Sequence, residues 1–373
     1  MRRTVTTIPL FIFCICLFAG GDVIENKDIP IKGTWDFGLQ KEWEVENAGD
    51  DVMARVNAVR VDDVGNIYVM EFTQSKIFVF GPAGKFLFSF GKKGEGPGEI
   101  KNAFRFFLLD DMIIVPELGK FSFFDLKGKF IKSMNTGRMV APLTFLDEGH
   151  FFHTGGLMSR EKKSGDMLYL FDLETRKDKV IAEIPKEEAL TATSGGMTLV
   201  LKDRTTTPGI VLALKDKHIY YGKSDKYLVK KAGLDGKEIF SFSLDGRKQK
   251  KISMAFKRKR FENVIVNGRK MAKEMVDQMA KSMPDEMPYF NRIMVDEQGL
   301  IYVFISDLEN EAGREIDIFS PEGKYLYHGE IKMPGNYKIS TALAFKDNFL
   351  FAFCEDEEGI GKLLKFKINL PKE

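Results

Sequence analysis

Short runs of alternating apolar and polar residues, each ended by a turn, recur along most of this chain. The clearest unit spans residues 57–91 and divides into four pieces of strand length, which are Asn57–Asp62, Ile67–Glu71, Lys76–Phe80 and Lys85–Phe90. Gly, Pro, Asn and Asp separate the pieces, as they do at the ends of strands. The pattern predicts a four-stranded antiparallel sheet.

The same unit returns later in the chain. Val295–Gly299 aligns with Val61–Gly65, and Ile301–Val303 aligns with Ile67–Val69. A Gly-Lys pair also recurs between the expected third and fourth strands, at Gly84, Gly128, Gly236 and Gly323. Glycine is favoured there because such hairpin turns often need a positive φ angle. Four matching turns indicate a repeat of the whole sheet.

The expected second strands give the number of repeats. They are Ile67–Val69, Ile113–Val115, Phe151–Phe152, Ile219–Tyr220, Ile301–Val303 and Phe349–Phe351. Sheets repeated at a period of roughly forty to fifty residues are typical of a β-propeller. The chain is therefore predicted to be an all-β, six-bladed β-propeller of four-stranded antiparallel blades in a single domain over residues 22–373. The expected blades cover about residues 52–91, 102–134, 140–184, 208–250, 288–332 and 338–370.

Two parts of the repeat are irregular. A long loop, at about residues 185–208, follows the weakest blade. The last blade has three strands, and residues 41–46 near the N-terminus are expected to supply the fourth and close the ring. Closure would pair two sheet edges that otherwise invite aggregation. An open stack of sheets or two separate β-domains are the alternatives.

A helical insertion, residues 254–287, is expected before the fifth blade. A helix is predicted over residues 267–282, with Met271, Met275, Met279 and Met283 four residues apart on one face. This face either packs on the propeller rim or belongs to a lid or docking helix, since methionine-rich faces adapt to partners. The basic cluster at residues 257–260 is expected to be solvated.

The N-terminus has the pattern of a signal peptide over residues 1–21. Arg2 and Arg3 precede the apolar segment Ile8–Phe18, and small residues end at Gly21. The apolar segment is shorter than the roughly 20 residues that span a bilayer. The sequence therefore predicts cleavage near Gly21 and export to the periplasm or the medium, without a membrane span.

Charge and cysteine content narrow the partners. The chain has 56 basic and 54 acidic residues, and loss of Arg2 and Arg3 with the signal peptide would leave 54 of each. This balance does not favour a nucleic-acid partner. Only Cys354 would remain in the mature chain, so no intramolecular disulfide is expected, and the thiol is interpreted as a small core residue.

Polar residues at the ends of the inner strands form the candidate site. Loops entering the first strands and leaving the second strands should converge on one face of the propeller near its axis. These positions hold Glu71, Arg105, Glu117, Arg292, Asp307 and Glu355. Carboxylates with two arginines can hold a cation, a sugar or a peptide terminus. Alternatively, the acidic side chains only cap turns or pair with nearby lysines.

Several segments resemble the NHL-type six-bladed propellers of exported bacterial proteins. The resemblance rests on Gly65–Val69, Ile77–Phe80 and the glycine-rich Phe90–Glu99, and it covers most of the mature chain. It implies a propeller fold that hosts enzymes, scaffolds and recognition modules alike. Some relatives are calcium-assisted lactonases or lyases with Glu, Asn, Asp and His ligands, of which Glu71 or Glu117 matches one.

Signatures of catalysis are sparse. No G-x-S-x-G, H-E-x-x-H or EF-hand pattern occurs. The favoured hypothesis is a monomeric, non-catalytic binding protein for a small polar ligand, a glycan or a peptide, with a protein, peptide or carbohydrate partner and no assured cofactor. The alternative is a calcium-dependent hydrolase or lyase with Glu71, Glu117 and Asp307 as ligands. A structural module of the envelope is a third class.

Overall fold

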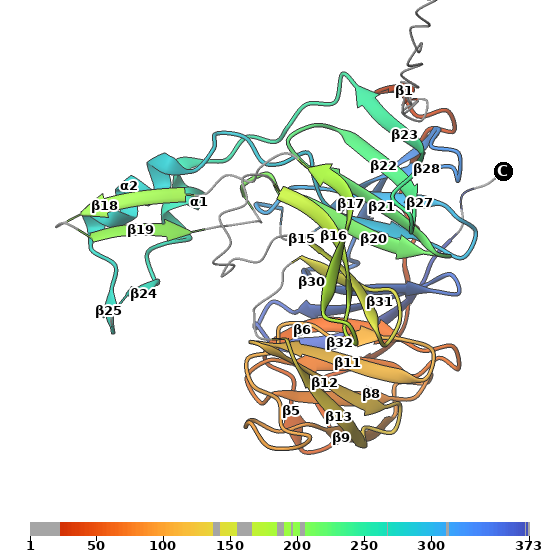
Figure 1. The fold of residues 1–373 in the computed structure, drawn as a ribbon, viewed down its shortest axis with the longest axis vertical. Coiled ribbons are helices and arrows are strands. Elements are labelled where there is room, and N and C mark those ends of the chain that lie inside the picture. The colour runs from red at the N-terminus through yellow and green to blue at the C-terminus, as the bar shows by residue number, and fades with distance from the viewer. Residues whose placement is uncertain are drawn as a thin grey trace, which may run out of the picture.

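The computed structural model describes residues 23–136, 142–154, 166–184, 190–194, 197–201, 206–266, 268–310, 313–369 and 371. The predicted signal peptide lies outside the described residues. The described chain is mostly strands, which form six sheets of four or five strands and three two-stranded sheets (Figure 1). We name the six larger sheets blades A to F in chain order.

Each blade is an antiparallel sheet in which the strands follow one another in sequence. Blade A contains β6 (Val56–Val61), β7 (Ile67–Glu71), β8 (Lys76–Phe80) and β9 (Phe86–Phe90). Blade B contains β10 (Phe107–Leu108), β11 (Met112–Glu117), β12 (Lys120–Asp125) and β13 (Phe130–Asn135). Blade C contains β14 (Leu143–Phe145), β15 (His150–Thr154), β16 (Asp166–Asp172) and β17 (Lys177–Ile184).

The second half of the ring follows the same plan. Blade D contains β20 (Ile210–Lys215), β21 (His218–Lys223), β22 (Leu228–Gly233) and β23 (Glu238–Asp245). Blade E contains β26 (Phe290–Val295), β27 (Ile301–Ile305), β28 (Gly313–Phe319) and β29 (Tyr325–Lys332). Blade F contains β30 (Lys338–Lys346), β31 (Phe349–Glu355) and β32 (Gly361–Lys367). A hairpin of two short strands, β4 (Asn47–Ala48) and β5 (Asp51–Val52), precedes blade A.

Six apolar clusters hold the ring together, and each is shared by two neighbouring blades. Ile77 of blade A packs with Ile113 of blade B, and the same pattern continues around the ring to the seam where Phe351 of blade F meets Val69 of blade A. Alternating side chains of each strand therefore face the two adjacent blades. The prediction of a six-bladed β-propeller is confirmed.

The N-terminal segment closes the ring. The strand expected at residues 41–46 corresponds to β3 (Gln40–Val45), which pairs antiparallel with β32 as the outer strand of blade F. Two further strands were not expected from the sequence. β1 (Val23–Lys27) adds parallel to β23 of blade D, and β2 (Thr34–Trp35) adds parallel to β29 of blade E. The segment thus supplies an outer strand to three consecutive blades.

A buried ionic network lies where this segment passes from blade D to blade E. The Asp317 carboxylate is completely buried and accepts hydrogen bonds from Tyr227 Oη (2.7 Å), Arg247 Nη2 (2.6 Å), Tyr325 Oη (2.8 Å) and His328 Nδ1 (3.0 Å). Arg247 also pairs with Asp28 at 3.0 Å, directly after β1. One carboxylate therefore joins blades D and E to the N-terminal segment.

The helical insertion and the long loop form a small lobe at the side of the ring (Figure 1). The lobe contains α1 (Met254–Lys259), α2 (Lys273–Ser282), the hairpin of β24 (Ile265–Val266) and β25 (Arg269–Lys270), and the hairpin of β18 (Leu190–Ser194) and β19 (Met197–Leu201). The expectation of an irregular loop over residues 185–208 was wrong for residues 190–194 and 197–201, which form that second hairpin.

The predicted helix over residues 267–282 was wrong at its start. α2 begins at Lys273, and Gly268 instead lies in a hairpin turn with a φ of 76°, a conformation that glycine adopts without steric cost. Asn267 lies outside the described residues. The periodic methionines extended the apparent helix because Met271, which precedes α2, faces the same core.

The methionine face is covered within the lobe itself. Met275 and Met279 are buried against Leu190 of β18 and against Phe261. The face therefore forms the core of the lobe, and it is not an open docking surface. The expectation that the basic cluster is solvated was wrong for Lys257, which is buried and pairs with Asp285 at 2.7 Å. Its amphipathic stem joins the core while the ammonium group finds a carboxylate.

Candidate functional site

The innermost strands carry positive charge and no negative charge. β6, β10, β14, β20, β26 and β30 are the first strands of blades A to F, and each lies at one edge of its sheet. Contacts join β6 to β30 and β10, and β20 to β14 and β26, so these edges surround the axis. No Asp or Glu occurs in these six strands, whereas Arg60, Lys215, Arg292, Lys338 and Lys346 do. The axis of the ring is therefore lined by cationic and neutral groups.

Arg60 reaches from blade A toward blade B. It lies on β6 opposite Tyr68, and its guanidinium lies 5.8 Å from the ring centre of Phe106. Arg60 Nη1 donates a hydrogen bond to the carbonyl oxygen of Val59 at 2.8 Å. Among the described residues, no carboxylate forms an ion pair with it. Within the described part of the chain, its charge is thus held by an aromatic ring and a carbonyl dipole.

Arg292 has the same kind of surroundings at the seam of blades E and F. It lies on β26 opposite Phe304, whose ring centre is 5.3 Å from the guanidinium. Arg292 Nη2 donates to the carbonyl oxygen of Leu343 on β30 at 3.1 Å. No carboxylate in the described part of the chain pairs with Arg292 either.

Burial and the charge of a neighbouring arginine lower the pKa values of Arg60 and Arg292. Burial lowers the pKa of Arg60 to about 10, with a further contribution from the charge of Arg105. Burial also lowers the pKa of Arg292 to about 9, helped by repulsion from Arg60. Both groups stay protonated at neutral pH. The two guanidinium groups therefore carry positive charge without an ion-pair partner among the described residues, and a bound anion would stabilise that charge.

The register explains how Arg105 joins this group. Phe107 lies opposite Ile114 in blade B as Arg60 lies opposite Tyr68 in blade A. Met294 is the equivalent residue in blade E, where it lies opposite Tyr302. Arg105 and Arg292 each lie two residues before these positions, so the two arginines occupy equivalent positions in opposite blades. Arg105 is exposed. The candidates Arg105 and Arg292 are thus brought to the axis.

Arg60 was missed in the sequence. A signal for it exists, because the repeat aligns Arg60 with Met294 and a charged residue is unusual at a strand position otherwise filled by apolar or small side chains. Its significance depends on the absence of a partner, which the sequence does not show.

The candidate carboxylates on the second strands are used by the chain itself. Glu71 is completely buried and accepts hydrogen bonds from the backbone N–H groups of Arg55 (3.0 Å) and Gln74 (2.6 Å). Glu117 accepts one from the backbone N–H of Lys101 and one from Ser122 Oγ, both at 2.7 Å. In blades A and B, the glutamate is hydrogen-bonded to the backbone of the segment that leads into the first strand.

The other two acidic candidates, Asp307 and Glu355, are placed differently from Glu71 and Glu117. Asp307 accepts hydrogen bonds from the backbone N–H groups of Glu309 (3.2 Å) and Asn310 (3.1 Å), which caps its own turn. Glu355 is exposed at the end of β31. Among the described residues, no three His, Cys, Asp or Glu side chains are placed to hold a metal ion together.

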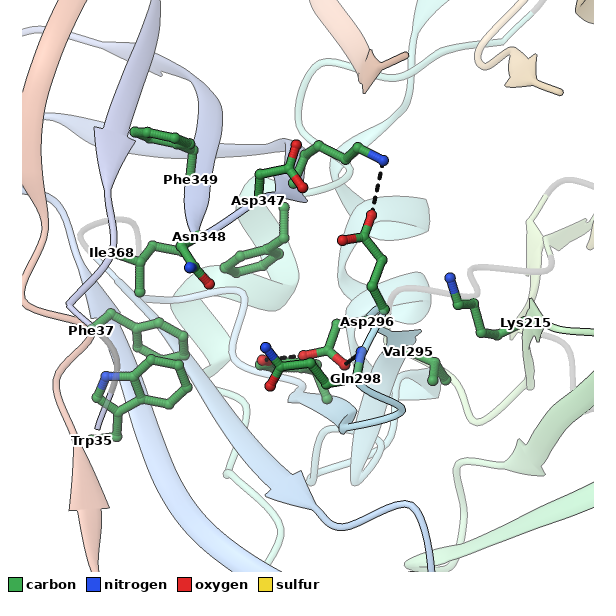
Figure 2. Close-up of a pocket in the computed structure, with 14 residues that line it drawn as sticks. Trp35, Phe37, Lys215, Val295, Asp296, Gln298, Asp347, Asn348, Phe349 and Ile368 are labelled. Carbon is green, nitrogen blue, oxygen red and sulfur yellow. Dashed lines mark hydrogen bonds and ion pairs between the residues drawn. The ribbon is translucent and has the colours of Figure 1, made fainter. Parts of the chain in front are cut away.

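A pocket of about 160 Å³ lies at the seam of blades E and F, beside the turns between the first and second strands (Figure 2). Trp35, Phe37 and Tyr302 contribute rings to its lining, and Lys346 lies at its rim. Lys346 pairs with Glu297 (2.8 Å) and Asp63 (2.9 Å), and these partners raise its pKa. Because this cation is neutralised, the arginines at the axis are the stronger candidate site.

Two further properties of the described chain bear on its class. The Cys354 thiol is buried, and burial raises its pKa to about 12, so it is not a reactive group. No helix within the described residues has the length and apolar character needed to cross a bilayer.

The fold defines a class, that of the six-bladed β-propellers. The chain belongs to the family DUF5128, described as a 6-bladed beta-propeller, whose model matches residues 48–315. No curated protein matches the sequence.

Solved structures share the fold at low sequence identity. A DUF4221 family member from Bacteroides vulgatus has a TM-score of 0.58 and 16% identity, covering 90% of this chain and 99% of its own. A Bacteroides fragilis protein that is thought to be exported has a TM-score of 0.55 and 13% identity, covering 93% of this chain and 100% of its own. At these identities the likeness shows the fold alone.

Proposed function

We propose that this protein is a non-catalytic binding protein whose axial arginines hold an anionic group of its ligand. The observation that carries the proposal is that Arg60 and Arg292 stand at the axis with no described carboxylate partner. An Arg–carboxylate or Arg–phosphate contact is strong and directional. The expected ligand, a small polar molecule, glycan or peptide, is thereby narrowed to one that carries a negative charge.

Titration with glutarate and with inorganic sulfate tests this function. Wild-type protein is expected to bind both anions in calorimetry at low ionic strength. Arg60→Gln and Arg292→Gln are each expected to weaken glutarate at least tenfold, about 1.4 kcal/mol, because each removes a charged hydrogen-bond donor.

Arg269→Gln is the matched control, since Arg269 is exposed in the lobe hairpin and should leave affinity unchanged. The proposal is wrong if neither anion binds, or if both axial variants bind glutarate as tightly as wild type does.

We do not extend the proposal to the calcium-dependent hydrolase or lyase. Its expected ligands Glu71 and Glu117 already accept hydrogen bonds from the chain with both oxygens. Releasing them for a metal would leave backbone donors of the crossing segments unpaired.

We also propose that the protein is exported and that its blades are of the NHL type. The signal-peptide pattern of residues 1–21 supports export, and the structural likeness to a protein thought to be exported agrees with it. Mass spectrometry of the protein from the native cell should find a mature chain that begins near Asp22, outside the cytosol. An intact N-terminus in the cytosolic fraction would contradict export. Superposing blade A on the blades of a solved NHL propeller tests whether the blades are of the NHL type.

A further inference from the structure

Two phenylalanine rings are stacked on the surface at the seam of blades A and B. The ring centres of Phe72 and Phe104 are 4.7 Å apart with an angle of 25° between the rings. The Arg55 guanidinium lies 4.6 Å from the ring centre of Phe72. Phe104 is 53% exposed. We call Arg55, Phe72 and Phe104 the aromatic shelf.

The backbone holds the aromatic shelf in place. Phe72 N–H donates to the carbonyl oxygen of Arg55 at 2.9 Å, and the buried Glu71 carboxylate accepts from the Arg55 N–H at 3.0 Å. These bonds fix Phe72 at the end of β7, and Phe104 lies in the segment that a hydrogen bond from Lys101 N–H joins to Glu117 of blade B. A platform that is fixed before binding loses little entropy when a ligand settles on it.

The aromatic shelf borders the axial arginines. Phe104 directly precedes Arg105, so their Cα atoms are about 3.8 Å apart. The Arg60 guanidinium lies 5.8 Å from the ring centre of Phe106, which is two residues after Phe104. Phe72 and Phe104 lie on the face of the ring where the chain enters β6 and β10, and Arg60 lies further along β6, one residue before that strand ends.

An exposed leucine extends the apolar surface on the same face. Leu118 is 61% exposed in the turn between β11 and β12. The hydrogen bond from Lys101 N–H to Glu117 brings this turn beside the segment that holds Phe104. Aromatic residues, arginine and an exposed aliphatic side chain together are typical of the centre of a protein interface.

We propose that the aromatic shelf and the axial arginines form one site for an acidic peptide segment. An apolar side chain of the segment lies on Phe104, and a neighbouring carboxylate lies against Arg60 and Arg292. This inference rests on the proposed function and adds the class of partner. Side chains two residues apart on an extended peptide are about 7 Å apart, which suits neighbouring subsites of this kind.

Two acetylated, amidated pentapeptides test the proposal, one with Phe two residues before Glu and one with Ala in place of that Phe. Wild-type protein should bind the Phe peptide at least fivefold more tightly than the Ala peptide. Phe104→Ser should remove this preference while glutarate binding stays at the wild-type level. Ile265→Ser, which changes an exposed apolar residue of the lobe, should keep the preference.

The outcomes separate the two proposals. Equal binding of the two peptides by wild type, or an unchanged preference in Phe104→Ser, overturns the peptide site while glutarate binding upholds the anion site. Loss of glutarate binding in wild type overturns the proposed function itself. A uronic-acid disaccharide that binds more tightly than the Phe peptide and depends on Phe104 would show an acidic saccharide site and overturn the peptide. Thermal unfolding by circular dichroism confirms that Phe104→Ser is folded.

Discussion

Replacing Asp317 with alanine is expected to lower the free energy of unfolding by about 3–5 kcal/mol. The carboxylate is completely buried and accepts hydrogen bonds from two tyrosines, a histidine and Arg247. Without it, the Arg247 guanidinium would keep the Tyr325 hydroxyl and, as its one counterion among the described residues, the partly exposed Asp28. Removing one partner of a buried ion pair leaves a charge that the protein interior solvates poorly.

Guanidinium-induced unfolding followed by tryptophan fluorescence measures this loss. Asp245→Ala is the matched control, because Asp245 forms an exposed ion pair with Lys27 of the same N-terminal segment. Exposed pairs contribute little, so this variant should unfold with the wild-type midpoint. An Asp317→Ala protein within about 1 kcal/mol of wild type would mean that the network adds nothing to the seam of blades D and E.

The double substitution Trp43→Ser and Val45→Ser is expected to lower the free energy of unfolding by about 3–4 kcal/mol and to promote aggregation. Both side chains of β3 pack against the cluster shared by blades F and A. Trp43 also lies against Gly84 of blade A and donates from Nε1 to the carbonyl oxygen of Pro82 at 3.2 Å. The tryptophan therefore joins the last blade to the first.

Denaturant unfolding and size-exclusion chromatography together test this closure. The double substitution Lys41→Ser and Glu44→Ser is the control, since it alters the same strand but removes exposed polar contacts, which are the Lys41–Glu44 ion pair and the contacts of Glu44 with Tyr337 and Lys362. It should remain monomeric and change stability by less than about 1 kcal/mol. Equal effects of the two double variants would show that β3 acts through strand pairing alone and not through Trp43 and Val45.

The repeat could be read from the sequence because its causes are local. Alternating side chains, Gly-Lys turns and the recurring Ile-Tyr-Val strand reflect strand geometry and turn chemistry, which act over a few residues. In the lobe, the local sequence pattern led to a wrong prediction for the start of the helix. The spacing of Met271 and Met275 satisfied a helical period, but Gly268 with its positive φ angle directs the preceding residues into a hairpin.

The candidate site was predicted in part. Its place on the inner strands and the residues Arg105 and Arg292 came from the repeat, whereas Glu71 and Glu117 proved to serve the fold through their hydrogen bonds to the crossing segments. Those hydrogen bonds join residues 16 positions apart, across a path that no short motif specifies. A carboxylate that binds a ligand and one that caps a segment look the same in the sequence.

The sequence by itself determined the repeated strands of the blades, the number of blades and the strand that completes blade F, because hydrophobic periodicity and turn residues act along the chain. Only the tertiary structure decided which charges lack a partner. Arg60 and Arg292 are 232 positions apart in the sequence, and the ring brings them to one axis, where neither forms an ion pair with a described carboxylate. Charge compensation depends on distance and burial in three dimensions, so the anion site and the aromatic shelf beside it became visible only in the folded ring.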